Sequence, residues 1–269
     1  MWPDSCKCAI AMSFDLDAET LWMEEYPKLS PSYLSRGEYG IRVGLPRILE
    51  LLNKYDITST FFVPGYVIEK YSDAVEKIIQ AGHEIGHHGY QHEPPSELEP
   101  GEESKILDKG ISIIKAISGK APAGYRSPSL DLSPVTVDLL IQKGFKYESS
   151  LMADEKPYYL YGSGQQGRLV EIPVDWSLDD APYYLFNYDQ PYWVGLTSPK
   201  KTLEIWKAEF DGYYKSGGCF SLIAHPQISG RHHRLQTLDS LLGYITKHSD
   251  VWYANLEAVA DYWLDNFSS

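Results

Sequence analysis

The chain has 269 residues, with 24 Lys and Arg against 37 Asp and Glu and a formal net charge of −13. This length is sufficient for one large domain with a substantial core. Because phosphates would be repelled by so acidic a surface, we expect neither nucleic acids nor anionic membrane surfaces as partners. No apolar run approaches 18 residues and no secretion signal is evident, which predicts no membrane span and favours a cytoplasmic protein.

The three cysteines, Cys6, Cys8 and Cys219, do not form the pattern of a disulfide framework. Cys6 and Cys8 lie two apart in an extended run, which places their side chains about 7 Å apart, too far for an unstrained bridge. We therefore expect all three to be reduced thiols.

Strand patterns alternate with helix patterns along the chain. In the first part of the chain the predicted strands are 8–17, 59–65, 83–88 and 123–129, and the predicted helices are 44–56, 73–82, 102–119 and 133–144. In the remainder the predicted strands are 145–150, 169–176, 219–226 and 251–255, and the predicted helices are 198–218, 237–249 and 256–267. Ser133 and Pro134 are predicted to begin the helix that ends before Gly144.

This alternation predicts an α/β fold with a parallel sheet. At this length it favours a single-domain (β/α) barrel of seven or eight strands over residues 1–269, with an open doubly wound sheet as the alternative. The Tyr- and Gly-rich segment 151–168 is predicted to be a loop and is the one candidate insertion. No glycine-rich phosphate turn follows the first strand, so nucleotide binding is not predicted.

Two overlapping histidine pairs occur in AGHEIGHHGYQHEPP, residues 81–95. His83 and His87 match the zinc-protease pattern H-E-x-x-H, which requires a helix, whereas glycines end the preceding helix and interrupt this segment. In a strand, His83 and His87 would lie about 13 Å apart and could not share one ion. A single turn after the strand would bring His92 to within about 6 Å of His88. We therefore expect His88 and His92 to be the metal ligands.

Titratable residues end several predicted strands: Asp15, Asp17, His88, Arg126, Asp175 and His225. A charged residue at the end of an apolar strand is costly to bury without a partner. Because the carboxyl ends of barrel strands form one face, where active sites lie, these residues predict a catalytic rim. Two histidines and one carboxylate with open positions are typical of a catalytic metal site.

The ordered segments SFDLD, HGYQH, YRSPS, VDW and SLIAH, which span residues 13–225, resemble the five motifs of the polysaccharide deacetylase family. This family is carbohydrate esterase family 4, also called the NodB homology domain. The resemblance implies a distorted (β/α) barrel, one divalent metal ion, usually zinc, and a hydrolase acting on carbon–nitrogen bonds. SRGEYGIRVGLPRILELL (35–52) and HPQISGRHHR (225–234) are similar to a branch with intracellular-type peptidoglycan deacetylases and allantoinase- or cyclic-imide-hydrolysing relatives.

By their positions in these motifs, Asp17, His88 and His92 resemble the metal ligands of the family, and Asp15 resembles its general base. Many members have adjacent aspartates in the first motif, whereas Leu16 separates the two aspartates here. The assignment of base and ligand within this pair therefore stays open.

The remaining roles implied by the resemblance concern residues that follow later strands. Arg126 resembles the arginine that holds the base, His225 the general acid, and Asp175 the carboxylate that tunes this acid. A backbone N–H near Arg126 is expected to stabilise the oxyanion. Trp176 is a candidate to pack against the face of a sugar.

Three functions are compatible with these residues: a metal-dependent deacetylase of N-acetylated amino sugars, an amidohydrolase that opens a cyclic imide or ureide, and a non-catalytic carbohydrate-binding module. The module would predict gaps in the catalytic set, and none is found. We expect the aromatic loops 152–168, 178–198 and 225–234 to fold over the site, which favours a small acetamido sugar or cyclic imide over a long glycan. The resemblance also implies a homotetramer as one assembly to expect.

Overall fold

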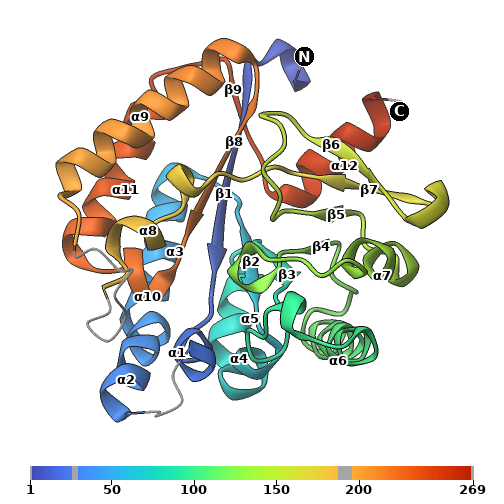
Figure 1. Ribbon diagram of the computed structural model, residues 1–269. Coiled ribbons are helices and arrows are strands. Elements are labelled where there is room, and N and C mark those ends of the chain that lie inside the picture. Colours follow the sequence, from blue (N-terminus) through green and yellow to red (C-terminus); the bar gives the residue numbers. More distant parts are fainter. Residues whose placement is uncertain (1, 26–29, 187–195, 268–269) are drawn as a thin grey trace.

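In the computed structural model, residues 2–25, 30–186 and 196–267 are described. Their strands are β1 (Cys8–Asp15), β2 (Thr60–Val63), β3 (Glu84–His87), β4 (Gly124–Tyr125), β5 (Tyr147–Glu148), β6 (Tyr158–Tyr161), β7 (Arg168–Glu171), β8 (Cys219–Ala224) and β9 (Val251–Tyr253). They form one curled sheet in the order β6-β7-β5-β4-β3-β2-β1-β8, and β9 pairs with β1 (Figure 1).

Helices surround this sheet (Figure 1). They are α1 (Thr20–Glu25), α2 (Pro31–Tyr39), the π-helical turn η2 (Gly40–Gly44), α3 (Leu45–Tyr55), α4 (Gly65–Lys70), α5 (Ser72–Gln80), α6 (Pro100–Ser118), α7 (Thr136–Lys143), α8 (Ala181–Tyr184), α9 (Pro199–Ser216), α10 (Pro226–Ser229), α11 (His232–Ile245) and α12 (Leu256–Asn266). The 3-10 turns near the site are η4 (Pro128–Leu130) and η6 (Trp176–Leu178). Among the described helices, none has both the length and the apolar character needed to cross a bilayer.

Strand β1 is the centre of the sheet, and all eight of its residues are buried. One edge of β1 pairs with β8 from Ala9 to Phe14. The other edge pairs with β9 at the start of β1 and with β2 at its end, where Asp15 lies opposite Phe62. A continuous apolar strand is typical of a parallel sheet that is covered on both faces. This pairing places Asp15 at the carboxyl end of the sheet.

The predicted fold class is confirmed, because the described residues form a curled α/β half-barrel of eight parallel strands with β6 as a ninth, antiparallel strand. The gap between β7 and β8 is bridged by the single pair Asp179 and Ile223. The backbone N–H of Asp180 also donates to Ile223 O at 3.2 Å. These two contacts distort the barrel and bring the segment after β7 against the end of β8.

Two details differ from the sequence prediction. Within 151–168, predicted as a loop, β6 pairs antiparallel with β7 at the edge of the sheet. Its run of Tyr and Leu has high strand propensity but lacks the alternation that marks a half-buried strand. The helix predicted to begin at Pro134 begins at Thr136, because the Ser133 hydroxyl accepts a hydrogen bond from Val135 N–H at 3.1 Å in a preceding turn. The three cysteines are free thiols, as expected.

Three glycines allow α2 and η2 to pack closely against the segments that follow β1 and β8. A Cβ added to Gly37 would lie 2.4 Å from the carbonyl oxygen of Ala18, and one added to Gly44 would lie 2.1 Å from that of Pro226. Gly40 makes a similar approach to α10. Only glycine permits such contacts between backbones. The GEYGIRVG sequence therefore holds the segments that follow β1 and β8, which carry site residues, against α2 and η2.

We expect Gly44→Ala to lower the free energy of unfolding by about 1–3 kcal/mol, the usual range for overpacking a close contact. Urea denaturation measures this change. Gly212→Ala in α9 is the matched control, because no described atom outside the backbone of its own helix and its chain neighbours lies within 4 Å of the added Cβ. Removing a helical glycine there should stabilise the protein by up to about 1 kcal/mol. Equal stability of both variants would contradict the close contact between Gly44 and Pro226.

Candidate active site

The predicted site residues meet at the carboxyl ends of the strands. Asp15 ends β1 and Asp17 follows two residues later, while His88, Arg126 and His225 directly follow β3, β4 and β8. A cavity of about 290 Å³ opens at this rim. Its lining residues are Asp15, Leu21, His88, His92, Ser127, Ser129, Leu130, Trp176, Asp179, Ala181, Leu185 and His225.

The structure brings together the three residues expected to bind a metal. Asp17, His88 and His92 are buried and each offers one ligand atom, all within 4.8 Å of one another. The turn after β3 returns His92 through a left-handed backbone conformation (φ 69°), so that its ring packs edge-on against His88 at 5.1 Å between centroids. His88 Nδ1 lies 2.7 Å from the carbonyl oxygen of Arg126. Because a carbonyl only accepts, Nδ1 carries a proton, and Nε2 is the atom that could bind a metal.

The donor set fits a divalent cation. The Oδ1 atom of Asp17 is buried, accepts no hydrogen bond from a described residue, and lies 3.4 Å from His88 Nε2. Its Oδ2 atom accepts a hydrogen bond from Gln227 Nε2 at 3.0 Å. A buried carboxylate oxygen facing an imidazole lone pair is unfavourable unless a positive charge lies between them. Two histidines and one carboxylate are a set of ligands that occurs in catalytic zinc sites of other proteins.

The side chains of His83 and His87 do not point into the cavity, because β3 is a strand and not a helix. His87 is buried with its Nε2 3.2 Å from the carbonyl oxygen of Leu107 in α6, and burial lowers its pKa to about 4. His83 Nδ1 accepts a hydrogen bond from Ser59 N–H at 3.2 Å. Neither residue lines the cavity, so the zinc-protease interpretation does not apply to this segment.

Arg126 holds Asp15 in a fixed orientation. The buried guanidinium donates from Nη1 to Asp15 Oδ1 at 2.9 Å and to Ser13 Oγ at 2.8 Å. Its Nε and Nη2 atoms donate to the backbone and hydroxyl oxygens of Ser149, and its plane lies 4.3 Å above the ring of Phe62. With Oδ1 occupied, the second oxygen of Asp15 lies 4.0 Å from His88 Nε2.

His225 is paired with Asp180. Its Nδ1 lies 2.6 Å from Asp180 Oδ1, and its backbone N–H donates to Asp180 Oδ2 at 3.0 Å. Its Nε2 faces the metal ligands, 3.7 Å from Asp17 Oδ2. Burial by itself lowers the pKa of His225, but the charge and hydrogen bond of Asp180, followed by the charge of Asp179, outweigh burial and raise this pKa well above its usual value.

The aspartate in contact with His225 is Asp180, which sequence reasoning missed, and not Asp175. Asp175 instead caps η6, where its Oδ1 accepts a hydrogen bond from Ser177 N–H at 2.7 Å. The VDW motif identified the correct segment, but the bridge to Ile223 places a carboxylate five residues later at the end of β8. The adjacent aspartates directly before α8 were the feature of the sequence that could have indicated this residue.

Asp179 is a second acidic residue that the sequence analysis did not select. It lines the cavity, and burial raises its pKa to about 7, with the charge of Asp180 adding to the effect and His225 opposing it. Asp179, Asp180 and His225 also lie close enough to hold a cation. However, their oxygens already accept hydrogen bonds from His225, Ser229 and Ala181. This cluster is therefore suited to holding a proton on His225.

The aromatic loops are distributed unequally around the cavity. Trp176 lines it with 48% of its surface exposed. Of the loop 178–198, the described residues Asp179, Ala181 and Leu185 contribute to the wall, and 187–195 lie outside the described residues. The expectation that 152–168 folds over the site is wrong, because this segment forms β6 at the sheet edge and lines no part of the cavity.

Sequence comparison identifies the family. The family described as polysaccharide deacetylase matches residues 38–148. A peptidoglycan deacetylase of Helicobacter pylori is 35% identical in an alignment that covers 94% of this chain and 94% of the relative. The chain belongs to the polysaccharide deacetylase family. A peptidoglycan deacetylase-like protein of Gibberella zeae is 30% identical over 88% of this chain and 80% of the relative.

Solved structures agree with this assignment. A Mycobacterium smegmatis structure assigned as a polysaccharide deacetylase has a TM-score of 0.92 and 37% identity, covering 97% of this chain and 92% of that chain. The structure of PuuE allantoinase has a TM-score of 0.88 with 23% identity, covering 98% and 93%, and shows a shared fold. This member of the deacetylase family is a hydrolase of carbon–nitrogen bonds other than peptide bonds.

Proposed function

We propose that this protein is a metal-dependent deacetylase of N-acetylated amino sugars of one or two rings. The observation that carries the proposal is the arrangement of Asp15, His225 and the cluster of Asp17, His88 and His92 around one cavity of about 290 Å³. The deacetylases that the chain resembles over most of its length support this substrate class. A cavity of this volume matches a ring-sized ligand better than a polymer chain.

Asp17, His88 and His92 would hold one divalent ion, which we propose is zinc, and a bound ion would supply Lewis-acid activation of water and of the amide carbonyl. Asp15 then acts as the general base and takes a proton from water on the oxygen that Arg126 leaves available. The water oxygen forms a bond to the acetyl carbon. This division of labour assigns Asp17 as ligand and Asp15 as base.

A backbone N–H stabilises the negative charge that develops on the carbonyl oxygen. The N–H groups of Arg126 and Ser127 already donate to His87 O and Ser150 Oγ. We therefore assign this role to the N–H of Ser129, which lines the cavity and has a left-handed backbone conformation (φ 57°).

His225 completes the reaction as the general acid. Its Nε2 donates a proton to the nitrogen as the carbon–nitrogen bond breaks, which releases acetate and a free amine. Asp180 keeps the ring oriented and favours its protonated form through Nδ1. Trp176, at the wall of the cavity, offers a flat apolar surface for the face of a sugar ring.

The proposed roles of Asp180 and Asp175 can be separated by the pH dependence of kcat/KM. The acid must carry a proton, so activity falls as the pH rises through the pKa of His225. Asp180→Asn removes the main charge that raises this pKa, and we expect the alkaline limb to move to lower pH and the maximal rate to fall. Asp175→Asn should leave the limb in place. An alkaline limb that moved with Asp175→Asn but not with Asp180→Asn would restore the original assignment.

Substrate size is tested by comparing acetate release from N-acetylglucosamine, its soluble oligomers and intact peptidoglycan. We expect the single ring and the disaccharide to be hydrolysed, with little acetate released from the polymer, because the cavity has the volume of one or two rings. Faster hydrolysis of long oligomers than of single rings would contradict this proposal.

A cyclic imide or ureide is the second candidate substrate, and the small volume of the cavity favours it equally. Attack of water on a ring carbonyl uses the same base, acid and ligands, but opens the ring and releases no acetate. Ring opening of succinimide and hydantoin, followed by absorbance, distinguishes this activity from deacetylation.

A further inference from the structure

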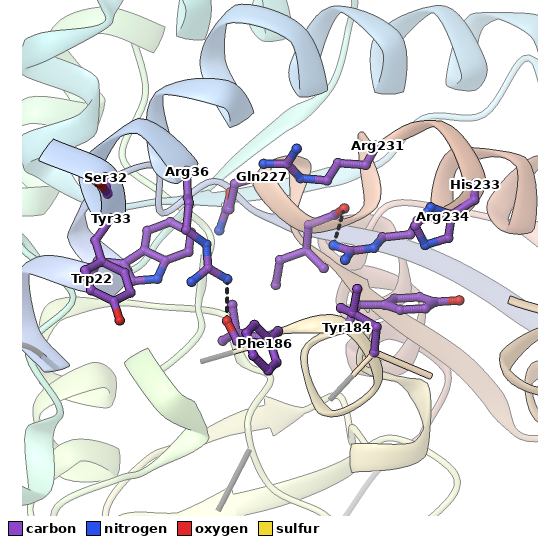
Figure 2. Close-up of a pocket in the computed structure, with 13 residues that line it drawn as sticks. Trp22, Ser32, Tyr33, Arg36, Tyr184, Phe186, Gln227, Arg231, His233 and Arg234 are labelled. Atoms are coloured by element: carbon purple, nitrogen blue, oxygen red, sulfur yellow. Dashed lines mark hydrogen bonds between the residues drawn. The ribbon is translucent and has the colours of Figure 1, made fainter. Parts of the chain in front are cut away.

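A second pocket, of about 500 Å³, lies beside the active-site cavity and shares Leu185 with it. Figure 2 shows Arg36 on one side of it and Arg231 and Arg234 on the other, and His233 also contributes to its wall. We call it the arginine pocket. No described residue of its lining is an Asp or Glu, although the chain as a whole carries a net charge of −13. Positive charge is therefore concentrated at one place on an acidic protein.

Arg234 is the most buried of the three arginines, with 7% of its surface exposed. Its Nη1 donates to the carbonyl oxygen of Ile228 at 3.1 Å, but its buried Nε has no hydrogen-bond partner among the described residues. A buried guanidinium with an unpaired donor is unfavourable unless a ligand completes its hydrogen bonds. The unpaired Nε of Arg234 thus indicates a bound ligand independently of the positive charge of the pocket.

Aromatic rings fix the planes of all three guanidinium groups. The guanidinium carbon of Arg36 lies 4.9 Å from the ring centroid of Trp22, that of Arg231 lies 4.0 Å from that of Tyr39, and that of Arg234 lies 4.9 Å from that of Tyr184. A stacked guanidinium loses little further freedom when its N–H edge binds a planar anion. The planar N–H fork of arginine matches a carboxylate in a bidentate arrangement.

The arginines are also close enough to repel one another. Burial lowers the pKa of Arg234, Asp180 opposes that effect, and the positive charges of Arg231 and Arg36 add to it. An anion between these side chains would remove the repulsion. The apolar rings around them favour a carboxylate carried by an organic ring over a strongly hydrated inorganic ion.

The arginine pocket and the active-site cavity share a wall. Leu185 lines both of them. Gln227 lines the arginine pocket and donates a hydrogen bond to Asp17 Oδ2 at 3.0 Å. The two spaces are therefore neighbours, and the side chain of Gln227 joins the wall of the arginine pocket to a proposed metal ligand.

We propose that the arginine pocket is the subsite for a carboxylate of the substrate, so that the preferred substrate is an N-acylated ring with an acidic substituent. This inference rests on the proposed amide hydrolysis at the adjoining cavity. It selects acidic acetamido sugars over neutral ones. The net negative charge of the protein would otherwise disfavour such substrates.

The test compares two sugars that differ in one acidic substituent: N-acetylmuramic acid, which carries a lactyl carboxylate, and N-acetylglucosamine. Calorimetry of the full-length Asp15→Asn variant, which is expected to keep its metal but to turn over only slowly, measures their binding. We expect the acidic sugar to bind at least about tenfold more tightly, which is the scale of one charge-assisted hydrogen-bonded pair. Arg231→Gln should remove most of this preference, Arg231→Lys should keep part of it, and neither should change the affinity for the neutral sugar. Arg231 is chosen because it is only partly buried.

The two proposals fail in different ways. Equal affinity for both sugars, or a preference that survives Arg231→Gln, would overturn the subsite even if both sugars were deacetylated. Tighter, Arg231-dependent binding of the acidic sugar without acetate release would support the subsite and contradict deacetylation. Inorganic phosphate should compete with the acidic sugar. Binding of phosphate that left the affinity for the acidic sugar unchanged would show that the arginines serve a separate anion and would overturn the proposal.

Discussion

His92→Ala is expected to abolish the binding of one zinc ion per chain. The variant leaves Asp17 and His88 as ligands, and two protein ligands with water hold zinc poorly. Metal content after dialysis against a weak chelator, measured by inductively coupled plasma mass spectrometry, gives the result. We expect about one equivalent in the unaltered protein and a small fraction of that in the variant.

His83→Ala is the matched control for this experiment. His83 belongs to the same segment but accepts a hydrogen bond from Ser59 N–H, away from the cavity. Its removal should leave the zinc content unchanged. Loss of zinc in His83→Ala together with retention in His92→Ala would show that the wrong histidine pair had been assigned to the metal.

His225→Ala and Asp15→Asn should each retain zinc yet lose on the order of 10²–10⁴ in kcat, the usual effect of removing a general acid or base. Each variant removes one proton-transfer group and leaves the three proposed ligands in place. Acetate release and zinc content are measured on the same preparations, so that loss of metal cannot be mistaken for loss of chemistry.

The two variants should also differ in how substrate structure affects their rates. A substrate with a good leaving group, such as N-acetylated nitroaniline, needs little help from the acid. It should therefore recover much of the activity of His225→Ala but not that of Asp15→Asn. Equal recovery in both variants, or full activity in either, would contradict the assigned roles.

The sequence was sufficient for the fold and for most of the rim because both depend on local patterns. Strand and helix periodicities alternate regularly, and the carboxyl ends of parallel strands meet at one face by the geometry of the fold. Asp15, Asp17, His88 and Arg126 each lie at or just after a strand end, so their proximity follows from strand order and register.

Asp180 could not be assigned in this way because its position depends on tertiary contacts. The segment after β7 contacts Ile223 through Asp179 and Asp180, which places Asp180 within hydrogen-bond distance of His225. The strand end and its resemblance to the VDW motif of the family favoured Asp175, whereas this carboxylate accepts a hydrogen bond from Ser177 in the turn η6.

The arginine pocket was also beyond reach from the sequence. Arg36 belongs to α2, whereas Arg231 and Arg234 belong to the segment that begins α11, nearly 200 residues later. HPQISGRHHR was recognised as a motif of the family branch, but its sequence does not indicate which residues from other parts of the chain lie opposite this segment. The close glycine contacts that dock α2 and η2 beside α10 create that arrangement.

An anomalous difference map at the zinc edge, from a crystal of the zinc-loaded protein, tests the central claim most directly. We predict one peak at about 2.0–2.2 Å from a carboxylate oxygen of Asp17 and from ring nitrogens of His88 and His92. Asp15 and His225 should flank the ion without coordinating it. A peak between Asp179, Asp180 and His225, or no peak at the rim of the barrel, would contradict the account.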